Sequence, residues 1–218
     1  MKTAVVWLAV LTAVLVTSAS AQVAISSPFR LLQAVVFYGT PPTSGYDADV
    51  LREARQFAQR AANYRPRPRP TGLGSEMRMV YSAREGYEGK LVAAAGPGTE
   101  RLAQQYVDDL RLCYEWESFA DCPEREAVFA EKYLAANPNS PFRELLEMLT
   151  AHRWLCVAEA YEREGQADAA ARARRAHQAQ LASSLKAQSP MMRTAARELQ
   201  TRGRCWPSGT VIGGVKEP

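Results

Sequence analysis

Apolar residues recur at intervals of three and four along most of the chain, which is the spacing of one face of an α-helix. The strongest example is residues 47–64, where Leu51 and Phe57 share one face and several arginines occupy the other. Residues 28–38 also have helical spacing, although residues 34–38 could instead form a short buried strand, and no other convincing strand pattern occurs. The predicted class is therefore all-α. Further helices are expected over residues 99–113, 121–136, 140–165, 167–187 and 189–203.

Local signals predict where several helices begin. Serine is a preferred N-cap, and proline fits the first helical position because its missing N–H has no partner there in any case. Thr99 and the run Asp121–Glu124 are expected to cap two further helices, the run as a capping box. The serine–proline pair occurs at Ser27-Pro28, Ser140-Pro141 and Ser189-Pro190.

Residues 65–98 contain the least regular pattern. Arg65 to Pro70 alternate arginine with proline, and neither a helix nor a central strand tolerates prolines at that density. We expect an extended, exposed spacer; the alternative is a docking strip for an acidic partner or for a proline-recognising groove. Residues 71–98 are rich in glycine and predict only a short helix over 75–83.

The N-terminus resembles an export signal. Lys2 precedes the apolar run Ala4–Val16, and Ala19-Ser20-Ala21 offers the small-x-small pattern of a cleavage site before Gln22. The run is shorter than the roughly 20 residues of a bilayer-spanning helix, and no later segment is as apolar, so we expect no integral membrane segment after cleavage. A periplasmic or secreted protein is predicted. Alanine- and arginine-rich usage without an Asn-x-Ser/Thr site favours a bacterial origin.

The expected organisation has four parts, and its charge is only mildly positive. The formal net charge is +4, with arginines interleaved among acidic residues, which does not indicate a nucleic-acid-binding surface. The parts are a signal peptide (1–21), an N-terminal helical region with two linkers (22–98), a disulfide-clamped helical region (99–206) and a flexible tail (207–218).

Four cysteines in an oxidising compartment predict two disulfides, for which three pairings exist. We favour Cys113–Cys122, which would clamp a helix–turn–helix corner, and therefore Cys156–Cys205, which would tie the last helix to an earlier one. No C-x-x-C pair is present and only two histidines are available, so we expect no metal and no cofactor.

Successive helices joined by short turns are typical of antiparallel helical hairpins, in a bundle or an α-solenoid. Residues 124–184 carry a more specific pattern, and the connector Asn137–Phe142 precedes its core. The residues that carry this pattern are Trp154, Val157, Ala158, Tyr161, Gly165 and Ala170. In residue type and spacing they resemble the characteristic positions of one tetratricopeptide repeat. Any antiparallel helix pair with small residues at its contact would show a similar pattern.

The segment departs from that family at three positions. Arg174 stands where the repeat has a large apolar residue, His177 where it has a small one, and Ala182 where it has proline. The resemblance implies a concave surface that grips a segment of another protein, with no catalysis of its own. Tyr133, Trp154 and Tyr161 are the residues expected to line such a groove.

A catalytic alternative rests on the acidic, aromatic run between Cys113 and Cys122. Glu115, Glu117 or Asp121 could act as general acid or base together with His152, which would make the protein an exported hydrolase. The simpler interpretation is that the aromatic residues of this run fill the core while its acids face water. His152 has Glu159 two turns later on the same helix face, and a lone histidine among leucines is more often a core residue.

The sequence therefore predicts an exported, soluble helical protein that acts as a protein-binding or adaptor module of the cell envelope. Its expected partner is another protein and not a nucleic acid. The hydrolase is the alternative, and a structural or toxin-neutralising secreted domain is a third class. If the hydrolase alternative is correct, an acidic side chain of the Cys113–Cys122 run should lie within hydrogen-bond distance of His152.

Overall fold

The computed structural model describes residues 31–113, 119–202, 204–205, 211–212 and 215–216. The fold is all-helical, as the periodicity predicted, apart from one pair of two-residue strands near the C-terminus. The expected signal peptide and the Ser27-Pro28 helix start lie outside the described residues. Within the described ranges, none of the helices combines the length and the apolar character needed to cross a bilayer.

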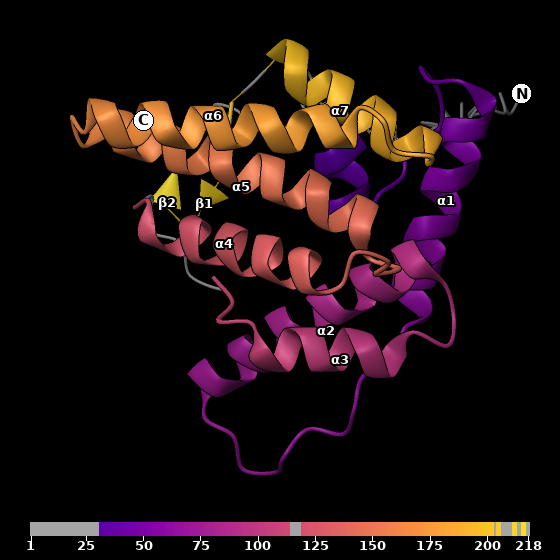
Figure 1. The fold of residues 1–218 in the computed structure, drawn as a ribbon. Coiled ribbons are helices and arrows are strands. Elements are labelled where there is room, and N and C mark those ends of the chain that lie inside the picture. The colour runs from indigo at the N-terminus through magenta and orange to yellow at the C-terminus, as the bar shows by residue number, and fades with distance from the viewer. Residues whose placement is uncertain (1–30, 114–118, 203, 206–210, 213–214, 217–218) are drawn as a thin grey trace, which may run out of the picture.

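The chain forms a π-helix, a series of α-helices and a small antiparallel strand pair (Figure 1). The π-helix, and not the competing strand, occupies the segment around residues 34–38. In chain order the elements are η1 (Leu32–Phe37), α1 (Ala48–Asn63), α2 (Ser75–Ala95), α3 (Glu100–Asp109), α4 (Asp121–Ala136), α5 (Arg143–Arg163), α6 (Ala167–Ser184), α7 (Pro190–Arg202), β1 (Val211–Ile212) and β2 (Val215–Lys216).

The helices α4, α5 and α6 run alongside one another, with α2 and α3 below α4 and α1 crossing one end of the stack (Figure 1). α5 is the central element, because its own buried side chains point to nearly every side of the helix. A larger core joins η1, α1, α2, α3, α5 and α7. A smaller, alanine-rich core lies between α4, α5 and α6, where small side chains let the backbones approach closely.

The helix α2 is far longer than expected. It spans Ser75–Ala95 although Gly86 and Gly89 both lie in its interior. Burial of Tyr87, Leu91 and Val92 against the larger core outweighs the low helix propensity of glycine. Gly89 also has a packing role, because a Cβ there would lie 3.3 Å from Cδ1 of Tyr64 at the end of α1. The prediction of a short helix over 75–83 was therefore wrong in its extent.

The serine signal predicted the start of α7 correctly but not that of α5. Ser189 Oγ accepts a hydrogen bond from Met192 N at 2.9 Å and so caps α7. Ser140 Oγ accepts one from Phe142 N at 3.2 Å, but in the turn before α5, which begins at Arg143 without a side-chain cap. Thr99 Oγ1 instead donates to a backbone carbonyl of the preceding turn, so it does not cap α3. The Asp121–Glu124 capping box is also wrong, since Asp121 is already helical and no side chain caps α4.

The N-terminal part of the described chain lies against its last helix, α7. Leu31 N donates to Glu198 Oε2 at 2.9 Å, and the Tyr46 hydroxyl donates to the other oxygen of Glu198 at 2.6 Å. On α1, the carboxylate of Glu53 accepts a hydrogen bond from Met191 N at 2.8 Å, in the first turn of α7. The N-terminal helices are therefore completed by residues more than a hundred positions later in the sequence.

Both predicted disulfides are confirmed. Cys113–Cys122 joins the segment after α3 to the first turn of α4, and Cys156–Cys205 joins the middle of α5 to the segment after α7. The bridges close loops with sequence separations of 9 and 49 residues. In the chain-entropy account, such crosslinks stabilise a fold by about 2–4 kcal/mol each.

Candidate functional site

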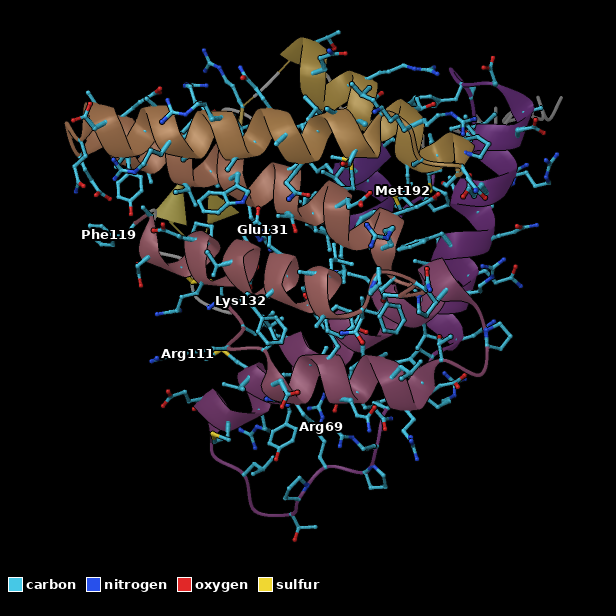
Figure 2. The ribbon with its side chains drawn as sticks, in the orientation of Figure 1. Arg69, Arg111, Phe119, Glu131, Lys132 and Met192 are labelled. Atoms are coloured by element: carbon cyan, nitrogen blue, oxygen red, sulfur yellow. A yellow bond between two sulfur atoms is a disulfide. The ribbon has the colours of Figure 1, made fainter. Side chains whose placement is uncertain are left out.

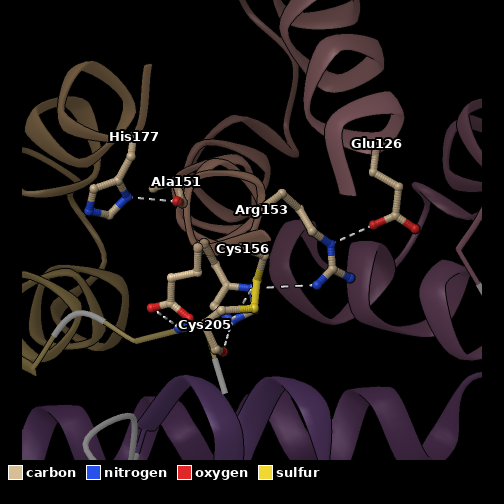
Figure 3. The surroundings of a disulfide bond; sticks show 8 residues. Glu126, Ala151, Arg153, Cys156, His177 and Cys205 are labelled. Carbon is tan, nitrogen blue, oxygen red and sulfur yellow. Dashed lines mark hydrogen bonds and ion pairs between the residues drawn. A yellow bond between two sulfur atoms is a disulfide. The ribbon is translucent and has the colours of Figure 1, made fainter. Parts of the chain in front are cut away.

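His152 lies in the interior, beside the Cys156–Cys205 disulfide (Figure 3). It is 1% exposed, and its Nε2 is 2.8 Å from the carbonyl oxygen of Cys205. A carbonyl only accepts, so Nε2 carries the proton, and Nδ1 is left to accept from Arg153 Nη1 at 3.4 Å. Burial, reinforced by the charge of Arg153, lowers the pKa of His152 to about 3. The imidazole is therefore neutral at physiological pH.

Arg153 connects this histidine to a buried carboxylate. Its Nε donates to Glu126 Oε2 at 2.5 Å, and Glu126 Oε1 accepts from Cys113 N at 2.7 Å. The Glu126 side chain is only 3% exposed. A continuous chain of hydrogen bonds thus runs from Cys113, through Glu126, Arg153 and His152, to Cys205. Figure 3 shows the link between Glu126 and Arg153. The two disulfides are linked by this polar path.

The catalytic arrangement predicted around His152 is not what the described residues form. Asp121 lies on the first turn of α4, where its side chain is 67% exposed and pairs with Arg125. Glu115 and Glu117 lie outside the described residues. Glu159, expected to share a face with His152, accepts from Cys205 N at 2.9 Å. His152 and Glu159 therefore hold the carbonyl and the N–H of one residue, Cys205, and anchor the segment that follows α7.

The neighbouring Arg174 and Arg175 led us to expect His177 on the outer face of α6, but it is buried. It is 9% exposed, and its Nδ1 is 2.8 Å from the carbonyl oxygen of Ala151 on α5 (Figure 3). Burial lowers its pKa. Ala173 lies one turn earlier and is also buried against α5, so the α6 face that contacts α5 includes position 177.

The three aromatic residues expected to line a binding groove pack at two different helix contacts, Trp154 and Tyr161 between α5 and α4 and Tyr133 between α4 and α3. The Trp154 indole donates to Glu131 Oε1 at 2.7 Å, and the Tyr161 hydroxyl donates to Glu124 Oε2 at 2.6 Å. Both belong to the smaller core, whereas Tyr133 packs against the larger one. Each fastens α4 to a neighbouring element, and the structure does not bring the three together in one groove.

The α5–α6 hairpin has some geometry expected from the repeat pattern. Gly165 occupies the turn with a φ of +73°, a conformation that favours glycine. Arg174, which stands where the repeat family has an apolar residue, points to the surface and forms two hydrogen bonds with Glu162, at 2.7 and 2.8 Å. Kinship with that family stays a prediction.

The segment 65–70, called the arginine–proline arm from here on, lies outside any helix or strand and is exposed, as predicted. Its arginines, however, find acidic partners within the chain. Arg67 forms two hydrogen bonds with Asp108 at 2.8 and 3.1 Å, and Arg69 donates to Glu85 Oε1 at 2.6 Å. Arg84 also contacts Asp108 Oδ1, at 2.6 Å. The arm is thereby fixed against α2 and α3, and Figure 2 shows Arg69 between the extended segment and the helices.

Sequence reasoning overlooked these ion pairs because it treated residues 71–98 as a linker. The signal was nevertheless present: Arg67 and Arg69 point to the same side of an extended segment, while Glu85 and Glu88 share one face of a helix. Asp108 completes the set, and the hydrogen bonds from Arg67 hold the pKa of its carboxyl below the usual range.

A pocket of about 360 Å³ opens between the arm and α2; we call it the arm pocket. Its apolar surface includes Met77, which is 46% exposed. Charges of both signs surround this surface. The apolar lining is Pro68, Pro70, Met77, Val80 and Tyr81, and the charged lining is Arg67, Arg84, Glu85, Glu88 and Asp108.

A second pocket, also about 360 Å³, lies where α1, α5 and α7 meet, near Met192 (Figure 2). Two of its carboxylates organise the start of α7. Glu53 binds Met191 N, and Glu144 accepts hydrogen bonds from Gln188 N at 2.6 Å and Ser189 N at 3.1 Å. The acidic lining of this pocket is therefore used to join helices.

Comparisons of the whole chain with protein-family models, with curated proteins and with solved structures gave no match.

Proposed function

We propose that this chain is an exported helical adaptor of the cell envelope, which binds another protein through the arm pocket. The observation that carries the proposal is the arm itself: an extended arginine–proline segment, fastened by ion pairs, that forms one wall of an apolar pocket. The two disulfides and the export-type N-terminal sequence support placement in an oxidising compartment, periplasmic or extracellular.

The lining of the arm pocket suits a peptide segment. Proline, methionine and tyrosine side chains offer apolar contact area, and methionine adapts to partners of different shape. The rim carries both charge signs, with Arg67 and Arg84 beside Asp108 and Glu85, so it can pair with either kind of charged side chain. Because ion pairs already hold the arm, binding costs little ordering of this segment.

Two methionines of α2 allow a matched test. Met77 and Met79 are 46% and 50% exposed and lie two positions apart, but only Met77 lines the arm pocket. The full chain, with an affinity tag, would serve as bait for the envelope fraction of its native host, and captured proteins would be identified and quantified by mass spectrometry. We expect Met77→Glu to abolish capture of a protein that wild type and Met79→Glu both retain. Equal capture by all three baits contradicts binding at this pocket.

The export part is tested separately. Intact-mass measurement of the protein from each cell fraction should give a mature chain that begins at Gln22, outside the cytoplasm, four mass units lighter than its fully reduced form. An uncleaved chain with four thiols inside the cell contradicts the proposal.

A further inference from the structure

We propose that reduction of the Cys156–Cys205 disulfide creates a site for one thiophilic metal ion of the Zn²⁺ class, held by His152, Cys156 and Cys205. The ligand atoms of these three buried residues all lie within 4.8 Å of one another. The proposal concerns the reduced chain, since a disulfide sulfur is not a thiolate ligand. It does not rest on the proposed function.

The spacing of the donors is close to what zinc requires. With Zn–S near 2.3 Å and Zn–N near 2.0 Å, tetrahedral geometry sets sulfur–nitrogen separations of about 3.6 Å and sulfur–sulfur separations of about 3.8 Å. Both ring nitrogens of His152 are already 3.9 Å from Cys156 Sγ. Once the bond between the sulfurs of Cys156 and Cys205 is broken, the two sulfurs need to separate by less than about 2 Å from an ordinary disulfide bond length of about 2.05 Å to reach that spacing.

The imidazole of His152 is prepared for this role. The lone pair that a metal would use is on Nδ1, because Nε2–H donates to the Cys205 carbonyl. Metal-binding histidines usually donate their second ring N–H to a carbonyl or carboxylate, which fixes the ring and the tautomer. The hydrogen bond to Cys205 already supplies that support, and coordination through Nδ1 would replace the 3.4 Å contact with Arg153.

The balance of charge also permits a cation. Breaking the disulfide consumes two electrons and two protons: a phosphine supplies the electrons and becomes a phosphine oxide while water supplies the protons, or a dithiol supplies both and becomes a disulfide. Zinc binding then releases the two thiol protons, so a Zn²⁺ ion with two thiolates is neutral. Arg153 lies beside the site, but Glu126 neutralises it at 2.5 Å. Three protein ligands leave one coordination position for water.

The other disulfide supplies the control. Among the described residues, no metal-binding group includes Cys113 or Cys122. The full chain would be purified oxidised, reduced with a phosphine, and titrated with Co²⁺ as the spectroscopic probe for Zn²⁺. We expect one Co²⁺ per chain, with thiolate-to-cobalt absorption that Zn²⁺ abolishes. The paired change of Cys113→Ser and Cys122→Ser should retain that absorption, and the paired change of Cys156→Ser and Cys205→Ser should remove it.

A second measurement covers the possibility that a variant fails to fold. In the reduced chain with Cys113→Ser and Cys122→Ser, Zn²⁺ should raise the thermal midpoint, and His152→Gln should weaken Co²⁺ binding by roughly 10-fold or more. Oxidised wild type should show no thiolate absorption. The proposal is overturned if reduced wild type, with its helicity verified by circular dichroism, gives no such absorption, or if His152→Gln leaves the affinity unchanged.

Discussion

Glu126 and Arg153 form a buried ion pair at 2.5 Å whose two ends reach different disulfides, Glu126 through Cys113 N and Arg153 through His152. The pair joins α4 to α5 in the interior. Removing one member of a buried pair leaves the other charge without compensation, which is far more costly than the pair's own net contribution.

Glu126→Gln should therefore lower the free energy of unfolding by roughly 3 kcal/mol or more. Asp121→Asn is the matched control: its carboxylate also pairs with an arginine, but on the surface, where the expected loss is below about 1 kcal/mol. Urea unfolding of both variants measures the difference. Losses of similar size would mean that burial does not set the strength of these pairs.

Stability should fall in acid partly because of His152. Its folded pKa, about 3, lies below the value of 6.5 expected for the unfolded chain. Between these values the unfolded state binds the additional proton, so stability is complete above about pH 6.5 and declines as pH falls toward 3. One such group contributes at most about 1.4 kcal/mol per pH unit.

His152→Gln isolates this contribution, because glutamine does not titrate and an amide N–H can still donate to Cys205. Unfolding free energies of wild type and variant should be measured from pH 7 to pH 4, where other groups affect both proteins alike. The expected result is a smaller decline for the variant. Parallel curves would show that His152 titrates normally in the folded state.

Two glycines of α2 should respond oppositely to alanine. A Cβ at position 86 would meet no atom of another segment within 4 Å, so Gly86→Ala should stabilise the helix by about 0.5–1 kcal/mol. Gly89→Ala would place the new Cβ 3.3 Å from the Tyr64 ring. That ring cannot move freely, because the Tyr64 hydroxyl donates a 2.5 Å hydrogen bond to Glu88. We expect Gly89→Ala to destabilise. Thermal unfolding of both variants tests this, and equal stabilisation would mean that α1 is free to move away.

Asp108→Asn should loosen the arginine–proline arm without unfolding the protein. Arg67 and Arg84 both lose an ionic partner, but the site is exposed, so the global loss should stay below about 1 kcal/mol. A protease of broad specificity should cut within residues 65–72 faster than in wild type. The control is Asp109→Asn, which removes the next carboxylate along α3. An unchanged cutting rate for Asp108→Asn would show that the ion pairs of Asp108 do not hold the arm.

The helices from α3 onward were predictable because their apolar faces repeat clearly and their ends carry serine, proline or glycine signals. Disulfide pairing followed from where the cysteines fall relative to those helices. α2 was harder to predict, since glycine lowers local helix propensity, while the burial of Leu91 and Val92 depends on partners elsewhere in the chain.

The side-chain networks depend on contacts between distant segments, which helix periodicity does not encode. The surroundings of His152 require Cys205, 53 positions later, to return to α5. The arm requires Asp108, 41 positions after Arg67. By contrast, the burial of His177 followed from a local spacing, four residues after Ala173, that a stricter analysis of the α6 face would have detected.

The hydrogen bonds from Leu31 to Glu198 and from Met191 to Glu53 determine when the fold can close. Synthesis proceeds from the N-terminus, so these contacts of Leu31 and α1 cannot form until α7 has been made. Contacts between sequence neighbours, such as α1 and α2, do not depend on that step. The docking of α7 is therefore the step that joins the two ends of the helical fold.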